Sequence, residues 1–482
     1  MEETKNNAFL GIEKESKLLL QFALPCVLSL IIQSLYNLVD QIFIGHCETL
    51  GAIGNAATGI VFPLTLIALG LGLWLGDGTA ALLSINQGKG DTHSSSKSVG
   101  TALSMGIIVS IVMMGICIPL KNNILQFIGA GGNILEKSSE YANFIFGGLL
   151  FFILASVINP IIRADGSPKY AMAAMAVGAL INIALDPLFI FAFDMGMTGA
   201  ALATFLGQTV TFIMNVAYLF KAKTFRLSLK DFIPDGKLFG MTAQFGVSSA
   251  LTQFAIVIVS VVTNIQLLKY SASSGYDVQI TQGVLTLAFK IFGIVVSIIV
   301  GIACGGQPIL GYNYGARKMD RVRNTMKYIL LSAAVVGIIS TLIFEFVPDI
   351  FLYIFGSGGS GVDPVAYKIF MERVFRIYMS AICLTCVLKS IAIFFQATGQ
   401  PVKSTAICLC RDVFVLVTVT VIFCNIGGIN LFLWAGPVAD VCGFVLAVIL
   451  YAHFLSKNTK QEAAAVSNRE YQDVILSTAK QE

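Results

Sequence analysis

The chain has 482 residues, of which 56% are hydrophobic and only 12% charged, and its mean hydropathy is +0.82. A soluble domain carries roughly a quarter charged residues because its surface faces water, so this composition excludes a soluble globular protein and a disordered one. The formal net charge of +4 is small, and the basic residues lie in short loops between apolar stretches, so no nucleic-acid partner is expected.

Twelve apolar segments follow one another along the chain, each long enough for a helix to cross a hydrocarbon core about 30 Å thick. They are predicted at residues 18–45, 52–85, 98–120, 138–163, 169–193, 197–220, 242–269, 279–312, 324–347, 367–396, 404–426 and 430–455. The predicted fold class is therefore an all-α integral membrane protein with twelve transmembrane helices.

The polar stretches divide the chain into an N-terminal segment, two six-helix lobes, a linker between them and a tail. Their predicted limits are 1–17, 18–220, 221–241, 242–455 and 456–482. The tail is polar, so we expect it to be disordered. Basic residues are concentrated in the loops that follow even-numbered segments, and by the positive-inside rule these loops and both termini lie in the cytoplasm. These residues are Lys89, Lys97, Arg163, Lys169, Lys221, Lys223, Arg226, Lys230, Lys237, Arg317, Lys318, Arg321 and Arg323.

The second half of the chain repeats the first. QFA at 21–23 recurs as QFG at 244–246, at an offset of 223 residues. Gly78 with NQG at 86–88 recurs as Gly305 with NYG at 313–315, at an offset of 227. ADGSP at 164–168 recurs as ATGQP at 397–401, at an offset of 233. Because each half has an even number of helices, the two copies have the same orientation in the membrane. They should be related by a pseudo-two-fold axis along the membrane normal, with a substrate cavity between them.

Short motifs along nearly the whole chain resemble those of the MATE (multidrug and toxic compound extrusion) transporters. They are LP at 24–25, QSLYNLVD at 33–40, FIG at 43–45, LGLG at 69–72, NQG at 86–88, ADGSP at 164–168, GMTGAA at 196–201, GYNYGA at 311–316 and AGPVAD at 435–440. Within that family the chain resembles the bacterial MepA-like drug exporters. The resemblance implies the MATE fold, two lobes that open alternately to either side of a bacterial inner membrane, and export of small-molecule drugs or organic cations. We expect a monomer surrounded by membrane lipids, with no cofactor.

Two acids lie inside apolar segments. A carboxylate at the centre of a bilayer costs about 2.5–3.5 kcal/mol on insertion scales, so Asp40 in the first segment is expected to face a polar cavity. It could instead sit at a helix end near Gly45 and His46, in contact with headgroups. Asp186 in the fifth segment precedes Pro187, and could likewise cap a proline-bent turn.

The residues around Asp186 suggest an ion site. Asn182 lies one turn before it on the same helical face, and Thr204 follows in the next segment. The resemblance implies that Asp40, Asn182, Asp186 and Thr204 form the site of the coupling ion. Two carboxylates with amide and hydroxyl oxygens could share a proton, or could hold a hard cation such as Na⁺. We predict H⁺ coupling, with Na⁺ as the alternative.

The second lobe carries no acid at the positions that correspond to Asp40, around Thr263 and Asn264. Its candidates are Lys290 and Lys389, which lie inside apolar runs. Each could be a charged cavity residue, or a lysine that extends its ammonium to the membrane surface. Asp440 is interpreted as a structural contact.

The first segment also supplies candidate cavity residues. Gln33 and Tyr36 lie about one turn apart on the helix of Asp40, and Tyr141 is the third candidate. The rings of the two tyrosines would bind a lipophilic cation. Tyr36 could equally belong to the interfacial aromatic belt. Pro25 removes a backbone hydrogen bond inside the same helix, so it is either a hinge or a static kink.

The predicted function is an ion-driven antiporter that exports amphipathic, mostly cationic compounds. The alternative within transport is a flippase for a lipid or a lipid-linked glycan. An integral-membrane enzyme is not predicted, because the three histidines (46, 93 and 453) lie near segment ends and form no reactive cluster in sequence. Glycine-rich stretches lack the GK[ST] of a phosphate-binding loop, which argues against ATP as the energy source.

Overall fold

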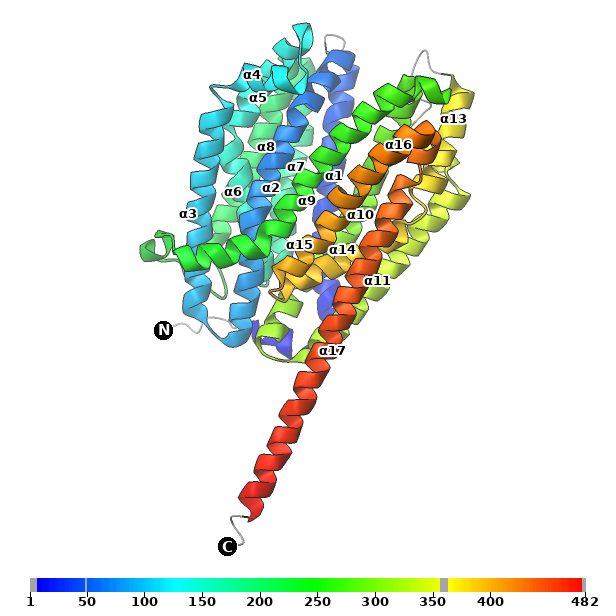
Figure 1. The fold of residues 1–482 in the computed structure, drawn as a ribbon. Helices are drawn as coiled ribbons and strands as arrows, with labels where there is room; N and C mark the ends of the chain where they lie inside the picture. Colours follow the sequence, from blue (N-terminus) through cyan, green and yellow to red (C-terminus); the bar gives the residue numbers. More distant parts are fainter. Residues whose placement is uncertain (1–6, 48–49, 356–362, 479–482) are drawn as a thin grey trace.

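The fold was analysed in a computed structural model, which describes residues 7–47, 50–355 and 363–478. All regular elements within these residues are helices (Figure 1). Ten helices are long and apolar enough to cross a membrane, and two pairs of bent helices each pass the same test together. If each bent pair is one span, the described residues contain the twelve spans that the sequence predicts.

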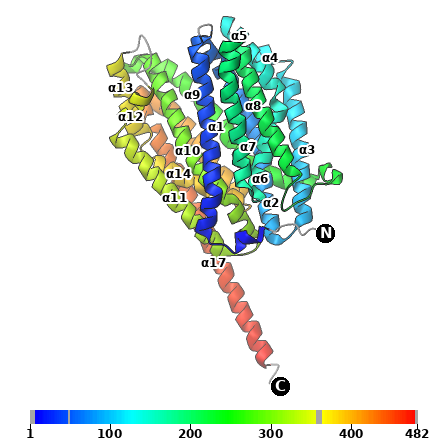
Figure 2. The same cartoon turned by 180° about the vertical axis from the view of Figure 1, so that it is seen from behind.

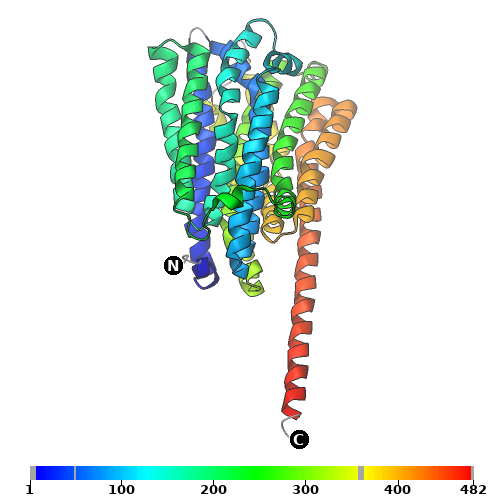
Figure 3. The ribbon, with the colours of Figure 1, turned by 90° about the vertical axis from the view of Figure 1, so that its left-hand side faces the viewer.

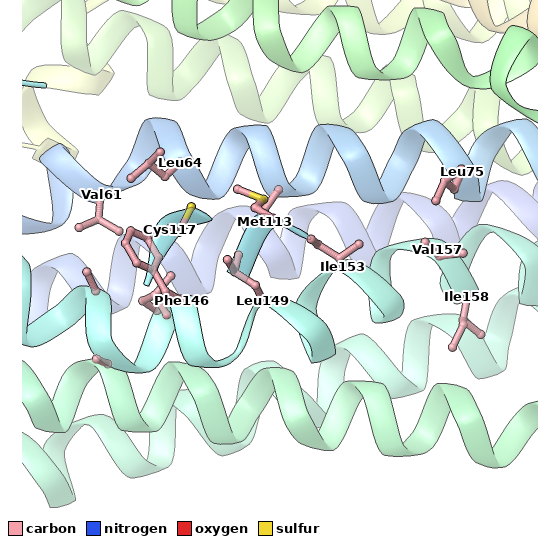
Figure 4. Packing of buried hydrophobic residues seen from close by; sticks show 14 of the residues in the cluster. Val61, Leu64, Leu75, Met113, Cys117, Phe146, Leu149, Ile153, Val157 and Ile158 are labelled. Atoms are coloured by element: carbon pink, nitrogen blue, oxygen red, sulfur yellow. The ribbon is translucent and has the colours of Figure 1, made fainter. Parts of the chain in front are cut away.

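The first lobe is built from the first eight α-helices. They are α1 (Glu15–His46), α2 (Gly51–Lys89), α3 (Thr92–Cys117), α4 (Lys121–Ile128), α5 (Gly132–Gly147), α6 (Leu149–Ala164), α7 (Pro168–Pro187) and α8 (Gly196–Leu219), with the short segments η1 (Asn7–Gly11) and η2 (Leu188–Ala192). Helices α5 and α6 form one span with a bend of 52°. Buried apolar side chains of α2, α3, α5 and α6 fill the centre of this lobe (Figure 4), among them Val61, Leu64, Leu75, Met113, Phe146, Leu149 and Ile153.

The second lobe follows a linker that contains η3 (Leu229–Phe232). Its elements are α9 (Gly236–Tyr270), η4 (Ala272–Ser274), α10 (Val278–Gly315), α11 (Met319–Phe346), α12 (Asp349–Phe355), α13 (Pro364–Arg373), η5 (Val374–Tyr378), α14 (Ile382–Ala397), α15 (Pro401–Leu409), η6 (Cys410–Val415), α16 (Leu416–Phe432) and α17 (Ala435–Thr478). The span from Pro364 to Ala397 bends by 47°. The elements η5 and η6 are π-helical.

Several helices begin five or six residues before their predicted segments, among them α3, α5, α9 and α11. Helix α9 begins at Gly236, earlier than the predicted residue 242, because the Asp235 side chain caps it by accepting hydrogen bonds from the backbone of Lys237 and Leu238. The tail was expected to be disordered, but α17 continues to Thr478 and projects from the bundle (Figures 1 and 3). The tail contains alanine, glutamate and glutamine and no glycine or proline, so nothing in it breaks the helix.

Glycines at the boundary between the lobes confirm the internal repeat. A Cβ atom on Gly78 of α2 would lie 2.9 Å from the backbone nitrogen of Gly246 on α9, and one on Gly305 of α10 would lie 2.5 Å from the Cα of Ala23 on α1. The repeat offsets of 227 and 223 relate the first pair to the second. Glycine allows such helices to approach each other backbone to backbone.

Helices α2 and α10 also cross each other symmetrically. A Cβ on Gly88 would lie 2.0 Å from the carbonyl oxygen of Tyr312, and a Cβ on Gly315 would lie 2.1 Å from that of Ile85. The same offset of 227 relates Gly88 to Gly315 and Ile85 to Tyr312. The two contacts are therefore equivalent in the two copies of the repeat. Such self-complementary contact is what a two-fold axis between the copies requires.

The N-terminal turn η1 packs against both lobes at this crossing. Asn7 Nδ2 donates a hydrogen bond to Gln87 Oε1 of α2 (3.1 Å), while Asn313 Nδ2 of α10 donates to the Leu10 carbonyl (3.0 Å) and Lys318 Nζ to the Gly11 carbonyl (2.9 Å). The turn η1 and the last part of α17 lie at this end of the bundle (Figures 1 and 2), which we call the terminal end. The described residues therefore join the two lobes tightly at the terminal end.

Candidate functional site

A cavity of about 520 Å³ lies between the two lobes. Its walls come from α1, α2, α6, α7 and α8 of the first lobe and from α9, α10, α14 and α15 of the second. At the terminal end the cavity stops at Asp77, next to the crossing at Gly78. In the other direction it continues past Leu66 to the exposed side chains of Phe62 and Asn37. The cavity is thus closed at the terminal end and continues toward the opposite end.

Four of the eight predicted first-lobe residues line this cavity. Gln33 and Tyr36 line it, as do Asn182 and Thr204. Tyr36 is therefore a cavity residue and not a member of an interfacial belt. Tyr141 is not among the side chains that line the cavity: it is 8% exposed, and its hydroxyl interacts with Thr204 of the cavity wall and with Asp40.

Close packing of α7 on α8 positions Asn182 beside Thr204. A Cβ on Gly178 would lie 2.6 Å from the carbonyl oxygen of Gly207, and the reverse distance is also 2.6 Å, so the two glycines let the helices touch. Asn182 Nδ2 then donates to Asp186 Oδ1 and to Thr204 Oγ1, both at 3.4 Å. Three of the four predicted ion-site residues are joined by these bonds.

Asp40 completes the set. It is 7% exposed, and its charge lies close enough to interact with Asp186 and with the hydroxyl of Tyr141. Burial inside the lobe argues against an Asp40 in contact with headgroups. Asp186 is fully buried, and it directly precedes Pro187 and η2, near the end of the span that also carries Asn182.

The acidic pair leaves buried acceptor atoms unused. Among the described residues, Asp40 Oδ1, Asn182 Oδ1 and Asp186 Oδ2 accept no hydrogen bond. Buried acceptors normally have a partner, so this group is suited to receive a proton or a cation. Neither carboxylate lines the cavity itself. Three residues that do line it interact with the carboxylates or with each other: Asn182 with Asp186 and Thr204, and Tyr36 with Asp40.

The two second-lobe lysines have different surroundings. Lys290 is exposed and its Nζ donates to Gln41 Oε1 of α1 at 3.1 Å, across the boundary between the lobes. Lys389 is 8% exposed, lines the cavity, and pairs with Asp412 at 2.6 Å. Lys389 therefore does not extend to the membrane surface.

Lys389 belongs to a buried four-charge cluster that sequence reasoning missed. Arg411 Nη1 contacts Asp412 Oδ1 at 2.6 Å and Arg411 Nη2 contacts Asp440 Oδ1 at 2.7 Å. Two cations and two anions balance within the cluster, and the π-helical segment η6 carries Arg411 and Asp412 into the interior. Asp440 is a structural contact, as predicted. The adjacent Arg-Asp pair inside an apolar segment is the signal that could have revealed the cluster.

A second polar network, which was not predicted from the sequence, forms the closed end of the cavity. Arg163 Nη2 pairs with Asp77 Oδ1 at 3.5 Å, Ser249 Oγ donates to Asp77 Oδ2 at 2.8 Å, and Gln396 Nε2 donates to Ser249 Oγ at 3.1 Å. All four side chains line the cavity. Asp77 was overlooked although it is the one acid of its segment.

Arg163 was predicted to lie in a cytoplasmic loop. It is instead part of α6 and only 8% exposed, because that helix continues to Ala164 and the turn begins only at Asp165. Its partner Asp77 belongs to α2, so the buried pair joins two helices of the first lobe. The network as a whole joins this pair to α9 and α14 of the second lobe.

Comparison with known proteins identifies the family. The family model MatE matches residues 25–188 and 248–421, one match in each lobe. The chain belongs to the MatE family. The resemblance seen in the motifs is thereby confirmed, and the MatE chain is a multi-pass membrane protein of a transporter family.

Individual relatives agree over almost the whole length of this MatE chain. It is 24% identical to the multidrug export protein MepA of Staphylococcus aureus (strain MRSA252), over 90% of this chain and 93% of that protein. Among solved structures, an outward-facing multidrug resistance MATE transporter of the MOP superfamily matches at 25% identity with a TM-score of 0.84, over 95% of this chain and 100% of that one. A MOP superfamily transporter from Pyrococcus furiosus matches with the same TM-score and coverage at 24% identity, which supports the fold.

Proposed function

We propose that the chain is a secondary active antiporter that exports amphipathic, mostly cationic compounds in exchange for protons, by alternating access. It would work as a monomer in a bacterial inner membrane, without a cofactor. One observation supports the proposal above the others: two buried carboxylates, Asp40 and Asp186, lie behind the wall of an inter-lobe cavity that is closed at one end.

The charge distribution of the loops suggests which side of the membrane the cavity faces. If the basic loops and both termini lie in the cytoplasm, the closed terminal end is cytoplasmic and the cavity opens outward. A solved relative with the same fold carries the description "outward-facing". In this orientation, protons from outside would reach Asp40 and Asp186 through the cavity.

Proton binding at the acidic pair would release the substrate. While a carboxylate is ionised, it attracts a cationic substrate held against Tyr36 and Gln33. Two neighbouring carboxylates in a desolvated site favour uptake of a proton, which removes that attraction. The cation is then lost outward, and the return of the lobes would carry the proton to the cytoplasm. Na⁺ bound by the same oxygens is the alternative coupling ion.

Asp40→Asn is expected to reduce efflux of a fluorescent lipophilic cation to the level of empty liposomes. The amide has a similar shape but cannot exchange a proton. The measurement uses proteoliposomes under a pH gradient alone and, separately, a sodium gradient alone, and the gradient that drives the wild type identifies the ion. Folded wild-type protein that transports no probe under either gradient would turn the interpretation toward a lipid or glycan flippase.

Pro25 is positioned to act as the predicted hinge. It lies inside α1 between Ala23 and Val27, the two residues at which α1 touches Gly305 and Gly301 of α10. Proline has no N–H, so the helix lacks the backbone hydrogen bond from residue 25 to the carbonyl of Gln21. Pro25→Ala is expected to slow transport several-fold while dye binding stays unchanged. Full transport activity of this variant would show that the proline is a static kink.

A further inference from the structure

The N-terminal turn η1 lies where the two lobes meet at the terminal end; it is the short dark blue segment below α1 in Figure 2. Two of its residues, Asn7 and Leu10, are 1% and 0% exposed, although the turn stands at the end of the bundle. Asn7 bonds to the first lobe and Leu10 to the second. Helices α2 and α10 cross beside the turn, so it bridges a contact that has to separate when the terminal end opens.

The attachment of η1 to the second lobe is extensive. The Leu10 carbonyl accepts hydrogen bonds from Asn313 Nδ2 at 3.0 Å and from Arg321 Nη2 at 3.3 Å. Lys318 Nζ donates to the Gly11 carbonyl at 2.9 Å, and a further ion pair of 3.3 Å joins Arg321 to the first turn of α1. The Leu10 side chain packs in an apolar cluster with residues of α10, α11 and α14. Several polar contacts and one buried apolar side chain therefore hold the turn on this lobe.

The attachment of η1 to the first lobe depends on one side chain. Within the described residues, Asn7 Nδ2 makes both hydrogen bonds from the turn to this lobe, to Gln87 Oε1 at 3.1 Å and to the Ala164 carbonyl at 3.4 Å. Gln87 is itself fixed by Thr224, whose hydroxyl accepts from Gln87 Nε2 at 2.8 Å. A Cβ on Gly166 would lie 2.6 Å from Asn7 Oδ1, so glycine at this position makes room for Asn7. The first lobe thus provides a fitted but small binding site for Asn7.

The corresponding turn of the second half has a different position. The turn η3 precedes α9 as η1 precedes α1, but it lies along α3, away from the crossing of α2 and α10 (Figure 1). Lys97 Nζ of α3 donates to the Lys230 carbonyl at 2.7 Å, and Thr101 Oγ1 of α3 accepts from the Asp235 backbone at 3.3 Å. Of the two turns, η1 is therefore the one placed to control the crossing.

We propose that η1 is a latch that moves with the second lobe and holds the terminal end closed, and that it is released when Asn7 parts from Gln87 and from the Ala164 carbonyl. The attachments to the second lobe outnumber those to the first, so the contact at Asn7 is the one that breaks. Water replaces the lost hydrogen bonds once the terminal end is open, so the latch can release and close again in each cycle. This inference rests on the alternating access proposed above and names the contact that controls one of its two states.

The first test follows the movement of η1. Spin-labelled non-natural amino acids are placed at three exposed positions: Ile12 next to η1, His93 on α3 of the first lobe and Asp320 on α11 of the second. Full-length protein in lipid nanodiscs is measured at alkaline and at acidic pH, since proton uptake by the acidic pair should open the terminal end. The Ile12–His93 distance is expected to gain a longer component at acidic pH, while the Ile12–Asp320 distance stays unchanged.

Asn7→Ala is the variant that weakens the latch. It removes both bonds to the first lobe, so the ratio of open to closed terminal ends is expected to rise about 2- to 10-fold, as the net value of a hydrogen bond implies. Asn215→Ala is the matched control. Asn215 is likewise buried and its Nδ2 donates to the Ala155 carbonyl at 3.2 Å, but both residues belong to the first lobe. The control loses a buried bond without changing the contact between the lobes, so its ratio should equal that of the wild type.

The outcomes separate the latch from the export function. An Ile12 label that keeps its distance to His93 and moves away from Asp320 would show that η1 stays with the first lobe, which would overturn the proposal. An unchanged ratio in Asn7→Ala, or an equal shift in Asn215→Ala, would overturn it as well. Wild-type protein that exports the fluorescent cation while the Ile12 distances never change would leave the antiporter standing without the latch. If the wild type neither exports the cation nor changes any distance, alternating access fails, and the latch with it.

Discussion

Alanine at Gly246 or Gly88 is expected to reduce gradient-driven efflux strongly, because the added methyl group would keep the terminal end from closing. A Cβ on Gly246 would lie 1.7 Å from the carbonyl oxygen of Trp74, and one on Gly88 would lie 2.0 Å from that of Tyr312. Backbone atoms cannot rotate out of the way. Overpacking typically costs about 1–3 kcal/mol, which would shift the balance between closed and open states roughly 5- to 150-fold.

The matched control is Gly59→Ala, in the same helix α2 as Gly88. A Cβ at Gly59 meets nothing within 4 Å, so this variant should transport like the wild type. Distances between spin labels on the terminal ends of α2 and α10 would report closure directly. Unchanged label distances and normal efflux in both Gly88→Ala and Gly246→Ala would contradict the assignment of these crossings as the closed gate.

Removing one charge from the buried cluster is expected to be strongly destabilising. In Lys389→Met the Asp412 carboxylate keeps a single cationic partner, Arg411. Arg411 also pairs with Asp440, so one cation faces two carboxylates. Breaking a buried ion pair by removing one partner typically costs about 3–5 kcal/mol because an uncompensated charge stays behind. We expect a large fall in Tm and a poor yield of folded protein, measured by thermal unfolding in detergent.

Removing both partners provides the test of this explanation. Lys389→Met combined with Asp412→Leu leaves the Arg411–Asp440 pair balanced, and it should recover most of the lost stability. Lys290→Met is the control for loss of a lysine, because Lys290 is exposed and donates one hydrogen bond, to Gln41. If the double variant is no more stable than Lys389→Met, charge balance is not what the cluster provides.

The length and periodic placement of apolar runs were enough to predict the helical spans and the repeat. A run of about twenty apolar residues has to cross the bilayer as a helix, since backbone groups in lipid need partners within the same segment. Asp40 and Asp186 stand out as acids inside such runs, whereas Asp77 and Asp412 gain their meaning only from the cations that the fold brings to them. The recurring glycines indicated the repeat, and the structure shows that Gly78 and Gly305 lie in equivalent helix crossings.

Which charges meet across helices was decided only by the tertiary structure. Partners such as Asp77 and Arg163 are 86 positions apart, and their distance depends on how α2 and α6 cross, which no local pattern encodes. The same holds for Lys389 and Asp412, which are 23 positions apart. The spans follow from local hydrophobicity and the repeat from recurring short motifs, so both can be read along the chain. The cavity and its charge pairs depend on how the helices pack, so they follow only from the fold.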